Sequence, residues 1–199
     1  MRLKALIPVV FLLLAPLGAR ANLIVNGGFE APVIPNGTFA LYPAGIPGWT
    51  TNFGPSIEIQ RNVAGAPFEG FQFVELDSTG NSGMFQDVVT APGASYLFSF
   101  AYSPRPNESA ASNGIEVRVD GNLINTLTGV GGGQTNWTVF SYLITGDGLT
   151  TIDFRAVGTS DSLGGYLDDV RLTTPEPATL ALFGVALAGL GFARRRKTR

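Results

Sequence analysis

The last 25 residues constrain this chain more than any other stretch. After Pro175-Glu176-Pro177 comes an apolar segment, Ala178 to Ala193, without charged or amide side chains, and five of the final six residues are Lys or Arg. Its sixteen residues rise only about 24 Å as a helix, so thinning of the bilayer or snorkelling of arginines must make up the difference. We expect a C-terminal transmembrane helix, with the basic tail inside and the preceding chain outside.

The order of Pro-Glu-Pro, short apolar helix and arginine cluster at the chain end resembles the PEP-CTERM sorting signal of Gram-negative bacteria that make exopolysaccharide. The resemblance covers residues 174–199. It implies that an exosortase, an intramembrane processing enzyme, recognises Pro175, Glu176 and Pro177 and removes the tail. An ordinary tail anchor is the alternative, and in either case the part before it works outside the cytoplasm.

The N-terminus predicts the same topology independently. Arg2 and Lys4 precede an apolar run, Ala5 to Leu17, and small residues follow at the positions that a signal peptidase reads. We expect a signal peptide over residues 1–21, with cleavage between Ala21 and Asn22.

Between the two signals lie 152 residues, Asn22 to Thr173, enough for one domain with a core. This part has five arginines, no lysine and fourteen Asp and Glu, a net charge of −9, which disfavours binding to nucleic acid or anionic lipid. The chain has no cysteine and no histidine. Disulfides and catalysis by a Ser-His-Asp or Cys-His system are therefore excluded.

The middle part predicts an all-β fold, because turn residues interrupt short apolar runs and no stretch keeps a helical period. In Ile115–Asp120 apolar and charged residues alternate, as in a half-buried antiparallel strand. We expect a two-sheet antiparallel jelly-roll sandwich. Its strands are predicted at Leu23–Val25, Ser56–Gln60, Gln72–Leu76, Gly83–Thr90, Tyr96–Tyr102, Ile115–Asp120, Leu123–Leu127, Trp137–Ile144, Thr150–Val157 and Tyr166–Leu172, with long loops at Ala31–Pro55, Ser103–Asn113 and Gly129–Gln134.

A second resemblance covers residues 22–172. The opening Asn22-Leu23-Ile24-Val25-Asn26-Gly27-Gly28-Phe29-Glu30 and the closing Gly165-Tyr166-Leu167-Asp168-Asp169-Val170-Arg171-Leu172 look like those of galactose-binding-like jelly rolls, in particular a domain of unknown function that bacterial surface proteins share with plant cell-wall proteins. The resemblance implies that the first and last strands pair. It also implies a structural calcium ion where an N-terminal Glu approaches the Asp pair of the last strand.

The residues permit such a metal site. Strand alternation puts Asp168 on the same face as Val170 and Leu172, so that Asp168 points into the core if they do. A buried carboxylate needs a partner, and Ca²⁺ held by Glu30 and Asp168, with Asp169 in reserve, would supply one. The alternative partners are backbone N–H groups, or an arginine such as Arg155 or Arg171.

Three functional classes remain open. The first is a non-catalytic cell-surface or extracellular-matrix protein, associated with exopolysaccharide and anchored in the inner membrane before processing. The second is a carbohydrate-binding module, for which we name Trp49, Phe53, Tyr102 and Arg105 as candidate ligand-binding residues. The third is a glycosidase with a pair of carboxylates, either Glu75 and Asp77 or Asp168 and Asp169. Because adjacent strand residues face opposite ways and no deep cleft is predicted, we expect that the protein is not an enzyme.

Overall fold

The computed structural model describes residues 21–175, which form twelve β-strands and no helix. No helix within these residues is therefore available to cross a membrane, and the predicted signal peptide and transmembrane helix lie outside them. The strands are β1 (Thr38–Tyr42), β2 (Gly45–Ile46), β3 (Trp49–Phe53), β4 (Ile57–Arg61), β5 (Phe73–Glu75), β6 (Gly83–Val89), β7 (Ser95–Ser103), β8 (Gly114–Val119), β9 (Asn122–Leu127), β10 (Thr138–Thr145), β11 (Leu149–Val157) and β12 (Tyr166–Thr173).

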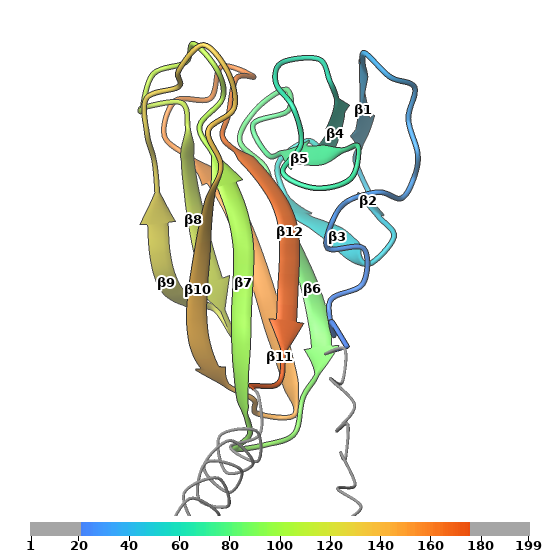
Figure 1. Cartoon of the computed structure of the whole chain (residues 1–199). Coiled ribbons are helices and arrows are strands. Elements are labelled where there is room, and N and C mark those ends of the chain that lie inside the picture. The colour runs from blue at the N-terminus through green and yellow to red at the C-terminus, as the bar shows by residue number, and fades with distance from the viewer. Residues whose placement is uncertain (1–20, 176–199) are drawn as a thin grey trace, which may run out of the picture.

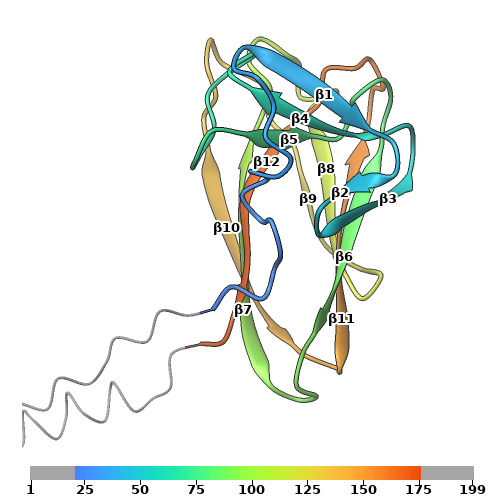
Figure 2. The same ribbon diagram turned by 90° about the vertical axis from the view of Figure 1, so that its right-hand side faces the viewer.

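The strands form two six-stranded antiparallel sheets that pack face to face (Figures 1 and 2). Sheet A has the order β1-β4-β5-β12-β7-β10, and sheet B has the order β2-β3-β6-β11-β8-β9. Strands distant in sequence are neighbours in both sheets, as in a jelly roll. The predicted fold class is confirmed.

The core lies between the sheets and is rich in aromatic side chains. Phe100 of sheet A meets Phe154 of sheet B edge to face, with ring centroids 5.1 Å apart. Phe98 lies 6.1 Å from the same ring, and all three side chains are fully buried. Burying each such side chain contributes about 1.5–3 kcal/mol, so this aromatic layer is a main source of the stability of the sandwich.

The chain enters and leaves the sandwich at one end, which we call the terminal end. The N–H of Leu23 donates to the carbonyl of Leu172 over 2.9 Å, so the first described residues lie beside the end of β12 (Figure 1). At the start of β12, Tyr166 lies opposite Ser103, where β7 ends. The connections 104–113, 128–137 and 158–165 therefore gather at the opposite end, called the loop end below (Figure 2).

Two predictions about the N-terminal quarter are wrong. Leu23–Val25 is not a strand, although it hydrogen-bonds to β12, as expected of the paired ends of the chain. The predicted loop Ala31–Pro55 contains β1, β2 and β3. Its many Gly and Pro residues hid these short strands, which are separated by tight turns; Gly45, the first residue of β2, and Gly48, in the turn after it, have positive φ.

The predicted alternation of side chains in β12 is also wrong. Leu167, Val170 and Leu172 all face the core, whereas Asp168 lies on the outer face of sheet A. The cause is a register shift between Asp168 and Arg171, where Asp169 adopts a φ of +48°. The extra residue of this bulge reverses the alternation.

Candidate functional site

A row of polar side chains crosses the outer face of sheet A near the loop end. Register places Glu58 of β4 opposite Glu75 of β5, Glu75 opposite Tyr166 of β12, and Tyr166 opposite Ser103 of β7. Directly paired residues of antiparallel strands share a face, so four strands contribute to one row. All four residues are buried, because the surrounding loops cover this part of the face.

Glu75 is the centre of the hydrogen bonds in this row. Its carboxylate accepts from the guanidinium of Arg105, from the side-chain amide of Gln60 and, over 2.6 Å, from the N–H of Gly164. The same Gln60 amide donates to Glu58 over 2.9 Å. A Cβ at position 164 would lie 2.6 Å from that of Asp77, so only glycine lets this backbone approach Glu75. We call Glu58, Gln60, Glu75 and Arg105 the buried polar cluster.

Burial shifts the protonation of both carboxyls in the cluster. It raises the pKa of Glu75 to about 9, and the Arg105 guanidinium opposes this shift. It raises the pKa of Glu58 to about 7, opposed by the hydrogen bond from Gln60. Desolvation thus favours the protonated, neutral form of both carboxyl groups. Electrostatic repulsion from Glu58 also raises the pKa of Glu75.

Aromatic rings lie beside the buried polar cluster at the loop end. Trp137 packs against Phe73 and Tyr166, with ring centroids 5.9 and 6.5 Å away, and Phe68 meets it edge to face at 6.2 Å. The Trp137 indole N–H donates to the carbonyl of Ala66 over 2.9 Å, which fixes the ring. Phe73 and Tyr166 are fully buried, whereas Phe68 is exposed and Trp137 half-exposed. We call Phe68 and Trp137 the aromatic platform.

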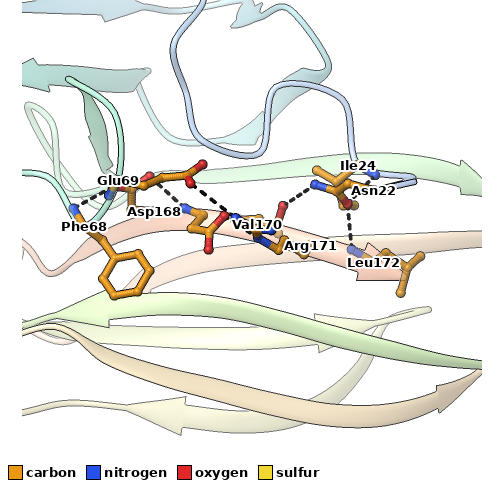
Figure 3. A network of polar contacts seen from close by, with 9 residues as sticks. Asn22, Ile24, Phe68, Glu69, Asp168, Val170, Arg171 and Leu172 are labelled. Atoms are coloured by element: carbon orange, nitrogen blue, oxygen red, sulfur yellow. Dashed lines mark hydrogen bonds and ion pairs between the residues drawn. The ribbon is translucent and has the colours of Figure 1, made fainter. Parts of the chain in front are cut away.

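A second polar site is built on the loop of residues 68–72. Asp168 accepts hydrogen bonds from the N–H groups of Phe68 and Glu69, over 2.8 and 3.1 Å, and from its neighbour Asp169 over 2.7 Å (Figure 3). Glu30 accepts from residues 71 and 72, over 2.6 and 3.0 Å. Burial raises the pKa of Asp168 to about 7, although these N–H groups lower it. The loop is therefore tied to the N-terminal segment and to β12.

The residues predicted to hold calcium do not form a complete metal site among the residues described. Glu30 and Asp168 use carboxylate oxygens to accept backbone N–H bonds, and Asp169 pairs with Arg171 at 2.6 Å. Within residues 21–175, no group of three or more His, Cys, Asp or Glu is arranged to hold an ion. The structure thus uses the backbone alternative named above for Asp168, and calcium stays a prediction.

Asn22 ties the start of the chain to its last strand. Its side-chain amide donates to the carbonyl of Val170 over 3.0 Å, and its side-chain oxygen accepts from Ile24 and Leu172 over 3.1 and 2.9 Å. Figure 3 shows these contacts beside β12, toward the opposite end of the strand from Asp168. We call this arrangement the Asn22 clasp. If the signal peptide is removed after Ala21, as predicted, Asn22 is the first residue of the mature chain.

The four predicted ligand-binding residues do not form one site. Trp49 is 2% exposed and packs between Phe29 and Phe154 in the core, so a sugar has no access to its ring. Tyr102 is buried and donates its hydroxyl to the carbonyl of Asn113 over 2.7 Å. Both assignments are corrected, because strand alternation turns these rings inward.

The other two predicted ligand residues lie on different sheets. Phe53, partly exposed on sheet B, has the Arg155 guanidinium 5.8 Å above its ring. Arg105 belongs to the buried polar cluster beside sheet A. Sequence reasoning missed Glu58, Gln60 and the aromatic platform. The only available signal was the position of Trp137 between a Gly-rich loop and a strand.

Solved structures with a similar fold include an adhesin domain and a carbohydrate-binding module. The K2 cleaved adhesin domain of Lys-gingipain matches with a TM-score of 0.50 at 16% identity, over 75% of this chain and 97% of that domain. The carbohydrate-binding module TmCBM61, solved with beta-1,4-galactotriose, matches with a TM-score of 0.49 at 18% identity, over 78% and 99%. At these identities the likeness shows the fold alone, a two-sheet antiparallel jelly-roll sandwich.

The C-terminal end of the chain is identified by sequence. Residues 173–197 match the model of the PEP-CTERM protein-sorting motif, so this chain carries that sorting motif. The recognition of the signal is confirmed.

Two curated proteins share sequence with most of the chain. Multifunctional-autoprocessing repeats-in-toxin proteins of Vibrio cholerae serotype O1 and Vibrio vulnificus are each 30% identical to it, over 157 and 153 residues. These matches cover 77% and 75% of this chain but only 3% of either toxin. The chain thus spans a very small part of the curated relatives that it matches.

Proposed function

We propose that the protein is exported, sorted by an exosortase and displayed at the cell surface or in the extracellular matrix, where it associates with exopolysaccharide without catalysing a reaction. The observation that carries this proposal is the sorting motif, whose match begins at Thr173, the last residue of β12. The sandwich therefore continues directly into the motif. Before processing, the chain is anchored in the inner membrane by residues 174–199.

The position of the motif also supports an orientation. Because β12 ends at the terminal end, a membrane segment after it holds that end toward the bilayer. The loop end, with the aromatic platform and the buried polar cluster, then faces away from the membrane. A surface protein needs its contact residues on that side.

The placement of the carboxylates supports a role without catalysis. Asp77 accepts hydrogen bonds from the N–H groups of residues 161 and 162 over 2.9 and 3.1 Å, and Glu75 is occupied by Arg105 and Gly164. Both are fully buried. A glycosidase instead needs two carboxyl groups that reach a sugar across a cleft.

Location and processing can be tested together by measuring the mass of the mature protein from cells and from culture supernatant. We expect a product that begins at Asn22 and lacks the basic tail. Replacing Pro175, Glu176 and Pro177 by alanine should leave the tail uncleaved and the protein in the inner membrane. A reporter fused just before Pro175 that is found in the cytosol would overturn the proposal.

The aromatic platform favours carbohydrate binding as a second candidate function. Sugar rings stack on aromatic faces, and Trp137 and Phe68 present such surfaces at the loop end beside Arg105. A glycan array with the exported protein tests this function. Binding should be lost with Trp137→Ala and kept with Phe71→Ala, which removes a more exposed ring that stacks on Arg61. Equal binding by both variants would exclude the platform.

Calcium at Glu30 and Asp168, with Asp169 in reserve, belongs to the proposal as a structural ion. Its support is the complete burial of the Asp168 carboxyl, because burial raises the pKa of this group and a buried charge needs compensation. An ion there would stabilise the charged form. It would hold the loop of residues 68–72 against β12.

A further inference from the structure

β10 forms one edge of sheet A and lacks the features that usually prevent an edge strand from pairing with another chain. β10 pairs with β7 over eight residues, Thr138 to Thr145, without a register shift, and it is the last strand of its sheet. Its sequence, TVFSYLIT, contains no charged residue and no proline. Exposed edge strands commonly carry charges, prolines or bulges that prevent pairing with another chain, and β10 has none of them.

The neighbouring edge of sheet B is also uncharged, although its pairing with β8 has a register shift between Val117 and Arg118. β9, with the sequence NLINTL, is the last strand of sheet B on the same side and also lacks charge. β9 and β10 lie beside each other in Figure 1. The side chain of Asn125 on β9 donates to the Tyr142 hydroxyl on β10 over 2.8 Å, which joins the two edges. Leu123 and Leu143 are 51% and 70% exposed. We call β9 and β10 together the uncharged side.

We propose that the uncharged side binds a second copy of this chain, through antiparallel pairing of β10 with β10 of the other copy. Charge favours this occupant. Residues 22–173 carry a net charge of −9, so two copies repel each other across most approaches. The uncharged side brings no carboxylate of either strand to the contact. Antiparallel pairing of identical strands is also self-complementary about a two-fold axis.

One register brings the exposed aliphatic side chains together. With Ser141 opposite Ser141 of the other copy, Val139 of each chain lies opposite Leu143 of the other. Val139 and Leu143 are 54% and 70% exposed, on the outer face of sheet A. Paired residues on one face bury each other, so the contact removes both side chains from water.

The proposed pairing fixes the direction of the two chains. β10 and β12 run parallel, because both are antiparallel to β7. Antiparallel pairing of two β10 strands therefore sends the two β12 ends in opposite directions. The terminal ends of the two paired copies therefore lie on opposite sides of the contact. This arrangement suits two chains that are held by two surfaces facing each other.

Cysteine substitutions in the processed protein, collected from the cell surface and from culture supernatant, test the proposal, because chains anchored in one membrane point the same way and cannot form the antiparallel pair. The chain has no cysteine, so Ser141→Cys introduces the only thiol. Opposite residues of an antiparallel pair have Cα atoms about 4.5–5.5 Å apart, within the range that a disulfide spans. We expect a covalent dimer on a non-reducing gel that reductant converts to monomer. The matched control is Val89→Cys, at a position 77% exposed on sheet B, which should stay monomeric.

A second substitution separates pairing from random collision. Leu143→Lys places a charge on an exposed residue of β10, so it should block pairing and leave the fold intact, with an unchanged unfolding midpoint. Ser141→Cys combined with Leu143→Lys should lose the dimer. The proposal is overturned if the combined variant dimerises as well as Ser141→Cys alone, if Ser141→Cys forms no more dimer than Val89→Cys, or if its thiol is captured by a different protein.

Discussion

Glu30 and Asp168, 138 positions apart in sequence, accept hydrogen bonds from backbone N–H groups of the same loop, residues 68–72. The first carboxylate follows the N-terminal segment, and the second lies on β12. The two ends of the chain therefore position a loop that carries Phe68 of the aromatic platform. Removing either carboxylate should therefore disturb the position of this loop at the loop end of the molecule.

Replacing Asp168 by alanine tests this coupling. The variant leaves the N–H groups of Phe68 and Glu69 without their acceptor, which should lower the free energy of unfolding by about 1–3 kcal/mol. Denaturant unfolding measures the change. Glu116→Ala, which removes an accessible pair with Arg118, should cost less than about 1 kcal/mol. Equal losses in the two variants would contradict a specific role for Asp168.

The calcium prediction is tested by thermal unfolding with Ca²⁺ and with EGTA. If Glu30, Asp168 and Asp169 hold an ion in the folded state, Ca²⁺ should raise the unfolding midpoint, because a ligand that binds only the folded chain stabilises it. Asp168→Ala should abolish that rise. An identical wild-type midpoint under both conditions would exclude the ion.

The buried polar cluster should make the protein less stable as pH rises. The pKa of Glu58 is raised from 4.5 to about 7 on folding, so the folded chain binds the proton more tightly than the unfolded chain. The stability that this proton contributes is complete below pH 4.5 and is lost as pH rises through 7. Glu58→Gln removes the titration. We expect it to match wild type near pH 4 and to exceed it at pH 8 by about 1–3 kcal/mol in denaturant unfolding.

Glu116→Gln serves as the matched control for this pH dependence. Its carboxylate, like that of Glu58, has a polar partner on a strand, but it lies at the protein surface beside Arg118. It should not give the gain in stability at pH 8 that we expect of Glu58→Gln. A wild-type protein whose stability is flat or rises between pH 5 and 8 would show that Glu58 is not the buried acid described above.

The Asn22 clasp should keep the last strand closed next to the sorting motif. Asn22→Ala removes three hydrogen bonds to Ile24, Val170 and Leu172, so we expect a loss of about 1–3 kcal/mol in the free energy of unfolding. Protease cleavage near Thr173 should become faster. Asn122→Ala, which removes one exposed bond to Asp120, is the control. The mass of each variant must first show that the signal peptide is removed at the same bond.

The sequence predicted those strands whose side chains alternate regularly. In β8, Ile115 and Val117 face the core and Glu116 and Arg118 face outward, as expected from polarity alone. Asp168 was assigned to the wrong face, because a bulge is not visible in a pattern of period two. The prediction of Trp49 as a ligand residue fails for a related reason, because the short strand that turns its ring inward lies in a stretch rich in Gly and Pro.

The candidate site depends on information that a single sequence does not contain. Glu58, Glu75 and Tyr166 meet only because β4, β5 and β12 are neighbours in sheet A, in a register set by distant parts of the chain. In the sequence, nothing distinguishes Glu58, Glu75 or Tyr166 from other strand residues. The sorting motif could be recognised because its three parts are consecutive and its chemistry is local.

The position of β12 in the middle of sheet A has a mechanical consequence. β12 is hydrogen-bonded to β7 along one side and to β5 along the other, and the chain leaves it along the strand axis toward the sorting motif. A pull on the anchored end, opposed by a load at the loop end, acts parallel to these strands. The hydrogen bonds of β12 are then loaded together in shear, rather than being unzipped one after another.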